Sequence, residues 1–213
     1  MNQITNFWNQ FKQNNFVFLL LNEIPKDELK IHFDKLIHCL HQYNKDLDLI
    51  IKNKRSEAEL IITANGNPYL FKEVELLVHH APVIKRWQIT AFLQPETNFT
   101  KYQKSIDKPI ENYGVSLKIS EMYFELIKIK NKPLEMGIRV YIKNYIVHSN
   151  NKNLRSAIYI HLEHLLGEKS FANDISLIDI TQIPNDSDEL KFIELYKLGA
   201  YIEKFKRDNN IEI

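Results

Sequence analysis

Hydrophobic residues near the start of the chain recur at the spacing of an α-helix. Ile4, Phe7, Trp8 and Phe11 lie three, four and seven positions apart, which predicts a short amphipathic helix. A second helix is predicted to begin near Pro25. Its apolar stripe is Leu29, Phe33, Leu36, Ile37 and Leu40. We therefore expect residues 1–45 to form a helical segment ahead of the first strand.

Alternating and continuous apolar runs then predict a hairpin followed by a crossover helix. Residues 47–52 and 59–64 are predicted strands, joined by a polar turn. The segment Asn65-Gly66-Asn67-Pro68 ends the second strand and opens a helix that stops at Pro82. Residues 87–93 are a third strand, closed by Pro95. The order over residues 46–95 is β-β-α-β.

The same order is predicted a second time after a polar connection at residues 96–116. Residues 119–129 and 136–142 are predicted strands, 153–166 a helix and 175–183 a strand, so a second β-β-α-β unit spans 117–184. A closing helix within 185–213 has a capping box, Asp186 with Glu189. We expect an α+β fold with one mixed sheet, forming a single domain over residues 1–213.

Charge and cysteine content narrow the classes of function. Lys+Arg total 28 and Asp+Glu 27, so the formal net charge is +1 and nothing favours general nucleic-acid binding. Cys39 is the one cysteine, which excludes an internal disulfide and fits a reducing compartment. No apolar run is long enough for a signal peptide or a membrane span. We expect a cytoplasmic protein without membrane contact.

Histidines offer the best metal candidates, but helix geometry separates them. His161 lies in the apolar stripe of its helix and Glu163 lies on the opposite face, so these two and His164 do not converge. His38 and His41 are one turn apart, and His38 faces away from the apolar stripe. We predict no metal and no cofactor. The position of His161 also predicts that Leu can replace it.

A loop between strand and helix is the candidate anion site. Asn65, Gly66 and Asn67 occupy a place where backbone N–H groups are available to an anion. The alternative is a tight turn in which Asn67 caps the helix, and it is the better supported one. With five glycines the chain has no phosphate-binding glycine loop, and no serine lies in a nucleophile elbow.

Strand alternation predicts a binding surface. Gln88 and Thr90, Arg139 and Tyr141, and Asp179 are polar or amphipathic members of predicted strands. Because each crossover helix covers an apolar sheet face, they should gather on the less covered face. The favoured alternative is that Arg139 and Asp179 form an ion pair on a solvated sheet.

The segments Ile61-Ile62-Thr63-Ala64-Asn65-Gly66-Asn67, Ala81-Pro82 and Trp87-Gln88-Ile89-Thr90-Ala91-Phe92 resemble a family of uncharacterised bacterial proteins. Its members have a strand ending in Ala-Asp-Gly-Asn, a helix ending in Ala-Pro and a strand led by Trp. Asn65 stands where that family has Asp. The resemblance implies an α+β cytoplasmic fold and no known activity.

Balanced charge, few glycines and the lack of a convergent catalytic group point to a non-catalytic protein-binding module of an accessory, regulatory or immunity type. The alternative is a hydrolase or transferase whose site is assembled from distant residues. A pocket lined by ionisable groups with shifted pKa values would favour the enzyme, whereas a shallow apolar or aromatic patch would favour the binding module.

Overall fold

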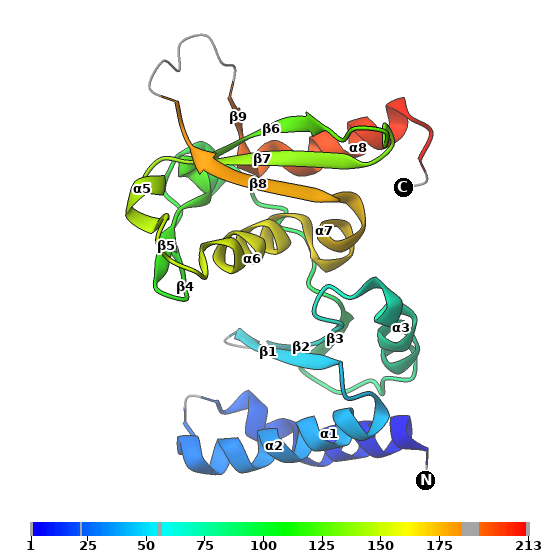
Figure 1. Cartoon of the computed structure of the whole chain (residues 1–213). Coiled ribbons are helices and arrows are strands. Elements are labelled where there is room, and N and C mark those ends of the chain that lie inside the picture. The colour runs from blue at the N-terminus through cyan, green and yellow to red at the C-terminus, as the bar shows by residue number, and fades with distance from the viewer. Residues whose placement is uncertain (1, 22, 55–56, 185–191, 212–213) are drawn as a thin grey trace. The chain divides into compact units, whose positions relative to one another are not determined.

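A computed structural model describes residues 2–21, 23–54, 57–184 and 192–211. The chain divides into two compact units, residues 1–93 and residues 94–213, and each is described by itself. Figure 1 shows the order of their helices and strands. The α+β class predicted from the sequence is confirmed.

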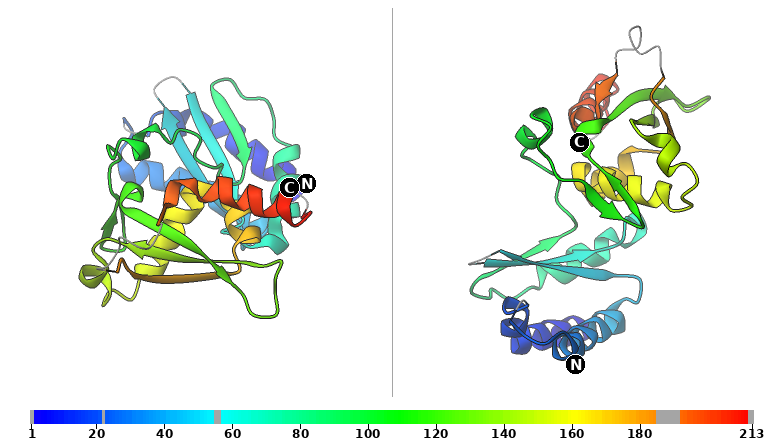
Figure 2. Two further views of the ribbon diagram at one scale, coloured as in Figure 1. Left: turned by 90° about the horizontal axis from the view of Figure 1, so that it is seen from above. Right: turned by 90° about the vertical axis from the view of Figure 1, so that its left-hand side faces the viewer.

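Two helices open the first unit, as predicted. α1 spans Gln3–Leu19 and α2 spans Lys26–Tyr43, and the two lie side by side (Figures 1 and 2). Helix α1 is longer than the predicted short helix because Val17 and Phe18 continue its buried face. The ring of Phe18 stacks 6.2 Å from that of Phe11, one of the residues on which the prediction rests.

The first β-β-α-β unit is confirmed. β1 (Asp48–Lys54) pairs with β2 (Glu57–Thr63) in antiparallel fashion, and β3 (Trp87–Ala91) lies parallel to β2 on its other side. The connection from β2 to β3 contains the 3₁₀ turn η1 (Pro68–Leu70) and helix α3 (Phe71–His79). The strand order is β1-β2-β3.

Side-chain hydrogen bonds tie the N-terminal helices to α3. The indole Nε1 of Trp8, in α1, donates to the carbonyl oxygen of Leu77 over 2.9 Å. The hydroxyl of Tyr43, at the end of α2, donates to Glu73 Oε2 over 2.8 Å. Trp8 is 4% exposed, so its bond is made in the core of this unit, where a missing partner is costly.

The second β-β-α-β unit has the same pairing pattern as the first. β6 (Met122–Lys128) and β7 (Met136–Ile142) form an antiparallel pair, and β8 (Leu177–Gln182) lies parallel to β7. A two-residue strand, β9 (Ile193–Glu194), pairs with the other edge of β6. The strand order is β8-β7-β6-β9.

Several short elements complete the second unit. They are α4 (Thr100–Gln103), β4 (Ile110–Asn112), β5 (Val115–Leu117), η2 (Ile119–Glu121), α5 (Tyr145–His148), α6 (Leu154–Leu166), α7 (Glu168–Asp174), η3 (Leu195–Lys197) and α8 (Leu198–Asp208). The predicted connection at 96–116 is therefore not wholly irregular. It contains α4 and β4, and Val115 and Leu117 are buried alternately with the exposed Ser116, as a half-buried strand requires.

The predicted single mixed sheet is wrong, because the described strands form three separate sheets. Each β-β-α-β unit completes its own sheet, of three and of four strands, and β4 pairs with β5 as a hairpin. Alternation within strands does not encode which strands become neighbours. The C-terminal helix is confirmed but begins at Leu198, whereas the predicted cap residues Asp186 and Glu189 lie outside the described residues.

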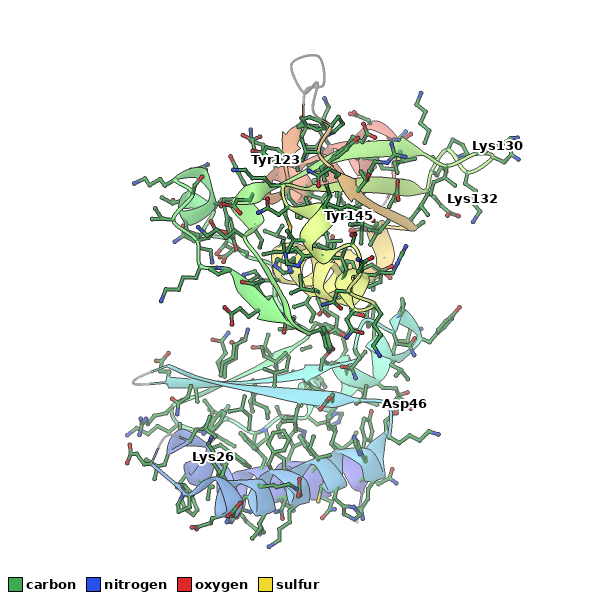
Figure 3. The ribbon with its side chains drawn as sticks, turned by 60° about the vertical axis from the view of Figure 1, so that its left-hand side comes forward. Lys26, Asp46, Tyr123, Lys130, Lys132 and Tyr145 are labelled. Carbon is green, nitrogen blue, oxygen red and sulfur yellow. The ribbon has the colours of Figure 1, made fainter. Side chains whose placement is uncertain are left out.

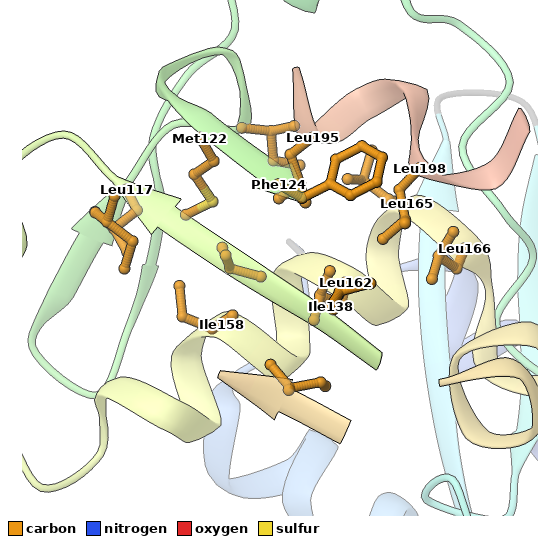
Figure 4. Close-up of a cluster of buried hydrophobic side chains, with 14 of the residues drawn as sticks. Leu117, Met122, Phe124, Ile138, Ile158, Leu162, Leu165, Leu166, Leu195 and Leu198 are labelled. Carbon is orange, nitrogen blue, oxygen red and sulfur yellow. The ribbon is translucent and has the colours of Figure 1, made fainter. Parts of the chain in front are cut away.

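One face of the four-stranded sheet carries the main core of the second unit. Phe124, Ile138 and Val140 are fully buried on that face, against side chains of α6 and α8 (Figure 4). The helix residues are Ile158, Leu162, Leu165, Leu198 and Ile202. Burial of one large apolar side chain contributes roughly 1.5–3 kcal/mol, so this face supplies much of the stability of the unit.

His161 belongs to this core, as its place in the apolar stripe predicts, and is fully buried. Its Nδ1 lies 2.7 Å from the carbonyl oxygen of Ala157, and its Nε2 lies 3.1 Å from the carbonyl oxygen of Leu117 in β5. Both ring nitrogens therefore face backbone acceptors, and the second of these contacts joins α6 to the β4–β5 hairpin. A neutral imidazole has one N–H to offer them at a time.

No helix among the described residues combines the length and the apolar character that a membrane crossing requires.

The contacts of His161 reverse the expectation that Leu can replace it. We predict that His161→Leu lowers the free energy of unfolding by about 1–3 kcal/mol, because it removes the donor that buried carbonyl groups face. Urea unfolding of the variant measures this. Leu165→Ala is the comparison, with an expected loss of about 2–5 kcal/mol from the cavity it leaves. Wild-type stability of His161→Leu would contradict the prediction.

Candidate functional site

The structure places the five predicted binding residues on two different sheets. Gln88 and Thr90 lie on β3 of the first unit, where Gln88 is exposed and the Thr90 hydroxyl donates to Glu59 Oε1 over 3.1 Å. Arg139 and Tyr141 lie on β7 and Asp179 on β8, both in the second unit. Three of the five are therefore brought together.

Those three residues share the sheet face opposite the core, which we call the open face. Strand register arranges its side chains in three rows across β6, β7 and β8. The apolar row is Ile127, Gly137 and Leu177, and the charged row is Glu125, Arg139 and Asp179. The third row is Tyr123, Tyr141 and Thr181, and we call it the aromatic row after its two tyrosines. The apolar row lies nearest the β6–β7 turn, from which Lys130 and Lys132 project, and Tyr123 lies toward the other end (Figure 3).

The charged row is a closed ion-pair network. Arg139 Nε donates to Asp179 Oδ2 over 2.6 Å, and Arg139 Nη1 donates to Glu125 Oε1 over 2.8 Å. The hydrogen bond to Asp179 is the main reason that the pKa of Arg139 is raised. The Arg139–Asp179 ion pair of the favoured alternative is therefore present, and Glu125 extends it. The three side chains are 36–47% exposed, so solvent weakens the network's contribution to stability.

Tyr141 is less accessible than a direct contact residue must be. It is 4% exposed, and the ring of Phe192 lies 4.7 Å away at 67°. Phe192 also lies 6.1 Å from the ring of Tyr123. Burial, followed by the interaction with Glu125, raises the pKa of the Tyr141 hydroxyl. Tyr141 is therefore a buried support for the aromatic row. Phe192 and Tyr123, which are partly exposed, are the rings nearer solvent.

Sequence reasoning missed Glu125 and Phe192. The strand alternation of Tyr123, Glu125 and Ile127 was a usable signal for the face of Glu125, but the register that places it beside Arg139 has no local signature. Phe192 precedes β9, in a stretch where the sequence predicted helix.

The turn predicted to bind an anion is a capped tight turn. Asn65 and Gly66 have φ angles of 52° and 74°, in the left-handed region that such turns use. Asn67 Oδ1 accepts from the N–H of Tyr69 over 3.1 Å and so caps η1. This is the alternative that the sequence favoured. An anion at this turn would have to displace the side chain of Asn67.

The histidines considered as metal ligands have separate partners. His161 contacts two carbonyls, as described above, and His164 Nε2 lies 3.6 Å from Glu96 Oε2. Burial and then the nearby Glu168 raise the pKa of Glu163. Within residues 2–21, 23–54, 57–184 and 192–211, no three His, Cys, Asp or Glu side chains could hold a metal ion.

His38 and Cys39 are adjacent but do not act on each other. His38 Nε2 lies 3.1 Å from Gln42 Nε2, whereas Asn6 Nδ2 donates to Cys39 Sγ over 3.6 Å. Burial raises the pKa of the Cys39 thiol, which keeps it protonated and unreactive at neutral pH.

A second group of ionisable residues surrounds Glu96, in the segment that the sequence predicted to be a loop. The Lys101 ammonium forms an ion pair with Glu96 Oε2, the oxygen that also faces His164. Glu96 Oε1 accepts from the backbone N–H of Asn98 over 2.9 Å. Burial raises the pKa of Glu96, but the bonds from Lys101 and Asn98 outweigh it and hold that pKa below its ordinary value.

Comparison of the chain with protein-family models, with curated proteins and with solved structures finds no match. The resemblance to a bacterial family carried by residues 61–67, 81–82 and 87–92 therefore stays an expectation.

The Glu96 cluster predicts a defined pH dependence. Glu96→Gln should lower the free energy of unfolding by about 1–2 kcal/mol at pH 7, because it removes the charge that Lys101 contacts. A depressed carboxyl pKa adds stability above the unfolded value of about 4.3 and loses it as the pH falls through the folded value. The difference between variant and wild type should therefore vanish in acid.

Urea unfolding of both proteins between neutral and acidic pH measures this difference. Glu111→Gln is the matched control, since Glu111 is an exposed residue of the same unit. A deficit for Glu96→Gln that persists unchanged in acid would contradict the assignment.

Proposed function

We propose that the chain is a non-catalytic, cytoplasmic protein-binding module and that the open face of the four-stranded sheet is its docking surface. The partner would be of the accessory, regulatory or immunity kind. The observation that carries this proposal is the charged row, in which Arg139 is held between Glu125 and Asp179 beside an apolar and an aromatic row. A surface whose side chains are already held in place loses little entropy on binding.

The rows also indicate the chemistry of the partner. Two carboxylates surround one guanidinium, which leaves one negative charge in excess. Leu177, 45% exposed, offers an apolar contact two residues from Asp179. The open face is therefore complementary to a segment that carries a lysine or arginine next to an apolar side chain.

The partner is proposed to lie across the face and not to extend the sheet at β8. Two backbone groups of β8 already have side-chain partners. Arg155 Nη1 donates to the carbonyl oxygen of Ile178 over 3.3 Å, and Asp179 Oδ1 accepts from the N–H of Ile180 over 3.0 Å. Side chains that occupy such groups blunt an edge against an added strand.

The resolved pKa shifts favour binding over catalysis. The pKa of Glu96 is lowered, whereas those of Lys101, Tyr102 and Cys39 are raised. Each shift holds its group more firmly in the protonation state it has at neutral pH. A hydrolase or transferase, the alternative, would gain from acids and bases poised near the working pH. Among the resolved shifts, the raised pKa of Glu163 is the one that moves toward it.

The test is a panel of random peptides displayed on phage and selected against the purified full chain. We expect enriched peptides to carry Lys or Arg beside an apolar residue. Leu177→Asp should weaken their binding about tenfold or more, because it adds a charge at the apolar row. Titration calorimetry with synthetic copies of the peptides measures the affinities.

Val147→Asp is the matched control, because Val147 is 76% exposed and lies on α5 of the same unit. Both variants should melt near the wild-type temperature, since neither site is buried. Peptides without a basic residue, or equal losses in the two variants, would overturn the proposal.

A further inference from the structure

A pocket beside the Glu96 cluster combines apolar walls with unsatisfied polar groups. Its volume is about 320 Å³, near the lower end of the roughly 300–1,000 Å³ typical of small-molecule sites. Apolar and aromatic lining comes from Tyr102, Ile106, Ile110 and Ile119. Polar lining comes from Lys101, Asp107, Lys108 and His164. All of these residues belong to the second unit.

Asp107 is the unusual member of this lining. It is 6% exposed, and its Oδ2 accepts from the N–H of Ser120 over 3.2 Å. Its other oxygen, Oδ1, is buried and accepts no hydrogen bond from the described residues. The Ser120 hydroxyl is likewise buried without a partner among them. Buried polar atoms left unpaired are costly, so a native structure with such a pair needs an explanation.

Lys108 supplies the opposite charge. It lines the same pocket, is exposed, and forms no ion pair or side-chain hydrogen bond with the described residues. Lys101 differs, because Glu96 already neutralises it. The pocket lining therefore combines a carboxylate that has one buried oxygen without a hydrogen-bond partner and a lysine that has no ion-pair partner among the described residues. The two follow each other in the chain.

We propose that this pocket binds a small zwitterion, of which a free α-amino acid is the simplest example. Its ammonium group donates to Asp107 Oδ1, and its carboxylate contacts the Lys108 ammonium. Its side chain lies against Tyr102, Ile110 and Ile119. Because Oδ1 is buried, the ligand reaches it by moving an adjoining side chain, and the exposed Ile106 and Lys108 flank Asp107.

Recognition of both charges predicts a specific pattern of ligands. The probes are the twenty amino acids, each tested by thermal shift and then by titration calorimetry with the full chain. For the best binder we compare the amine made by removing its carboxylate and the acid made by removing its ammonium group. Each half should bind at least about tenfold more weakly than the zwitterion, because one charged contact is lost.

Variants separate this site from general charge effects. Asp107→Asn should weaken zwitterion binding about tenfold or more while leaving the melting temperature without ligand nearly unchanged, since the amide oxygen of Asn can still accept from the Ser120 N–H. Lys108→Met should also weaken zwitterion binding, because it removes the ammonium group that contacts the carboxylate of the ligand. Lys130→Met on the β6–β7 turn is the matched control and should bind as the wild type does (Figure 3).

Three results would overturn the proposal. They are the absence of binding by every amino acid, equal binding of a zwitterion and its two halves, and unchanged affinity in Asp107→Asn. None of these bears on the open face, so the two proposals stand or fall separately.

Discussion

Side-chain alternation along β6 and β7 is the constraint on which the second unit depends. Met122 and Phe124 of β6 and alternate residues of β7 enter a core closed by α6 and α8, with Phe124, Ile138 and Val140 fully buried, whereas Leu126 near the β6–β7 turn is exposed. Antiparallel pairing then sets the opposite rows, so that Glu125 must lie beside Arg139, and the parallel strand β8 brings Asp179 to its other side. A shift of register by one residue would place these charges in the core and the apolar residues in water. Burial of the apolar face of the sheet thus fixes which side chains lie on the open face.

A few buried polar contacts add specificity to this hydrophobic framework. His161 links α6 to Leu117 in β5, and Trp8 links α1 to Leu77 in α3. Each joins elements that apolar packing alone would allow to slide. A buried polar atom without a hydrogen-bond partner is costly in the interior, where the dielectric constant is low. The packing arrangement that pairs such atoms is therefore favoured over similar arrangements that leave them unpaired. Among the described residues, Trp87 Nε1, Asp107 Oδ1 and Ser120 Oγ depart from this rule, and of these three residues Asp107 lines the pocket that we propose as a ligand site.

The two ion-pair groups of the second unit, around Glu96 and around Arg139, hold fixed charges. Glu96 is held ionised by Lys101, and Arg139 is held between two carboxylates. Groups of this kind recognise charge on a partner and pre-order a surface, but they transfer protons poorly near neutral pH because their pKa values lie far from it. For this physical reason the ion pairs of the open face support our proposal that this face is a place of binding.

The sequence alone determined the local elements and much of their order. Helical spacing of Ile4, Phe7, Trp8 and Phe11 located α1, and the alternation in residues 136–142 located β7 to the residue. It also determined that His161 is buried and that Asn67 caps a turn, because neighbouring residues decide both. Tertiary structure alone decided that the described strands form three sheets, that Glu125 joins the Arg139–Asp179 pair, and that Glu96, Lys101 and His164 meet. These outcomes depend on pairing and packing between segments that are far apart in the chain. A local sequence pattern does not specify which distant segment becomes the partner.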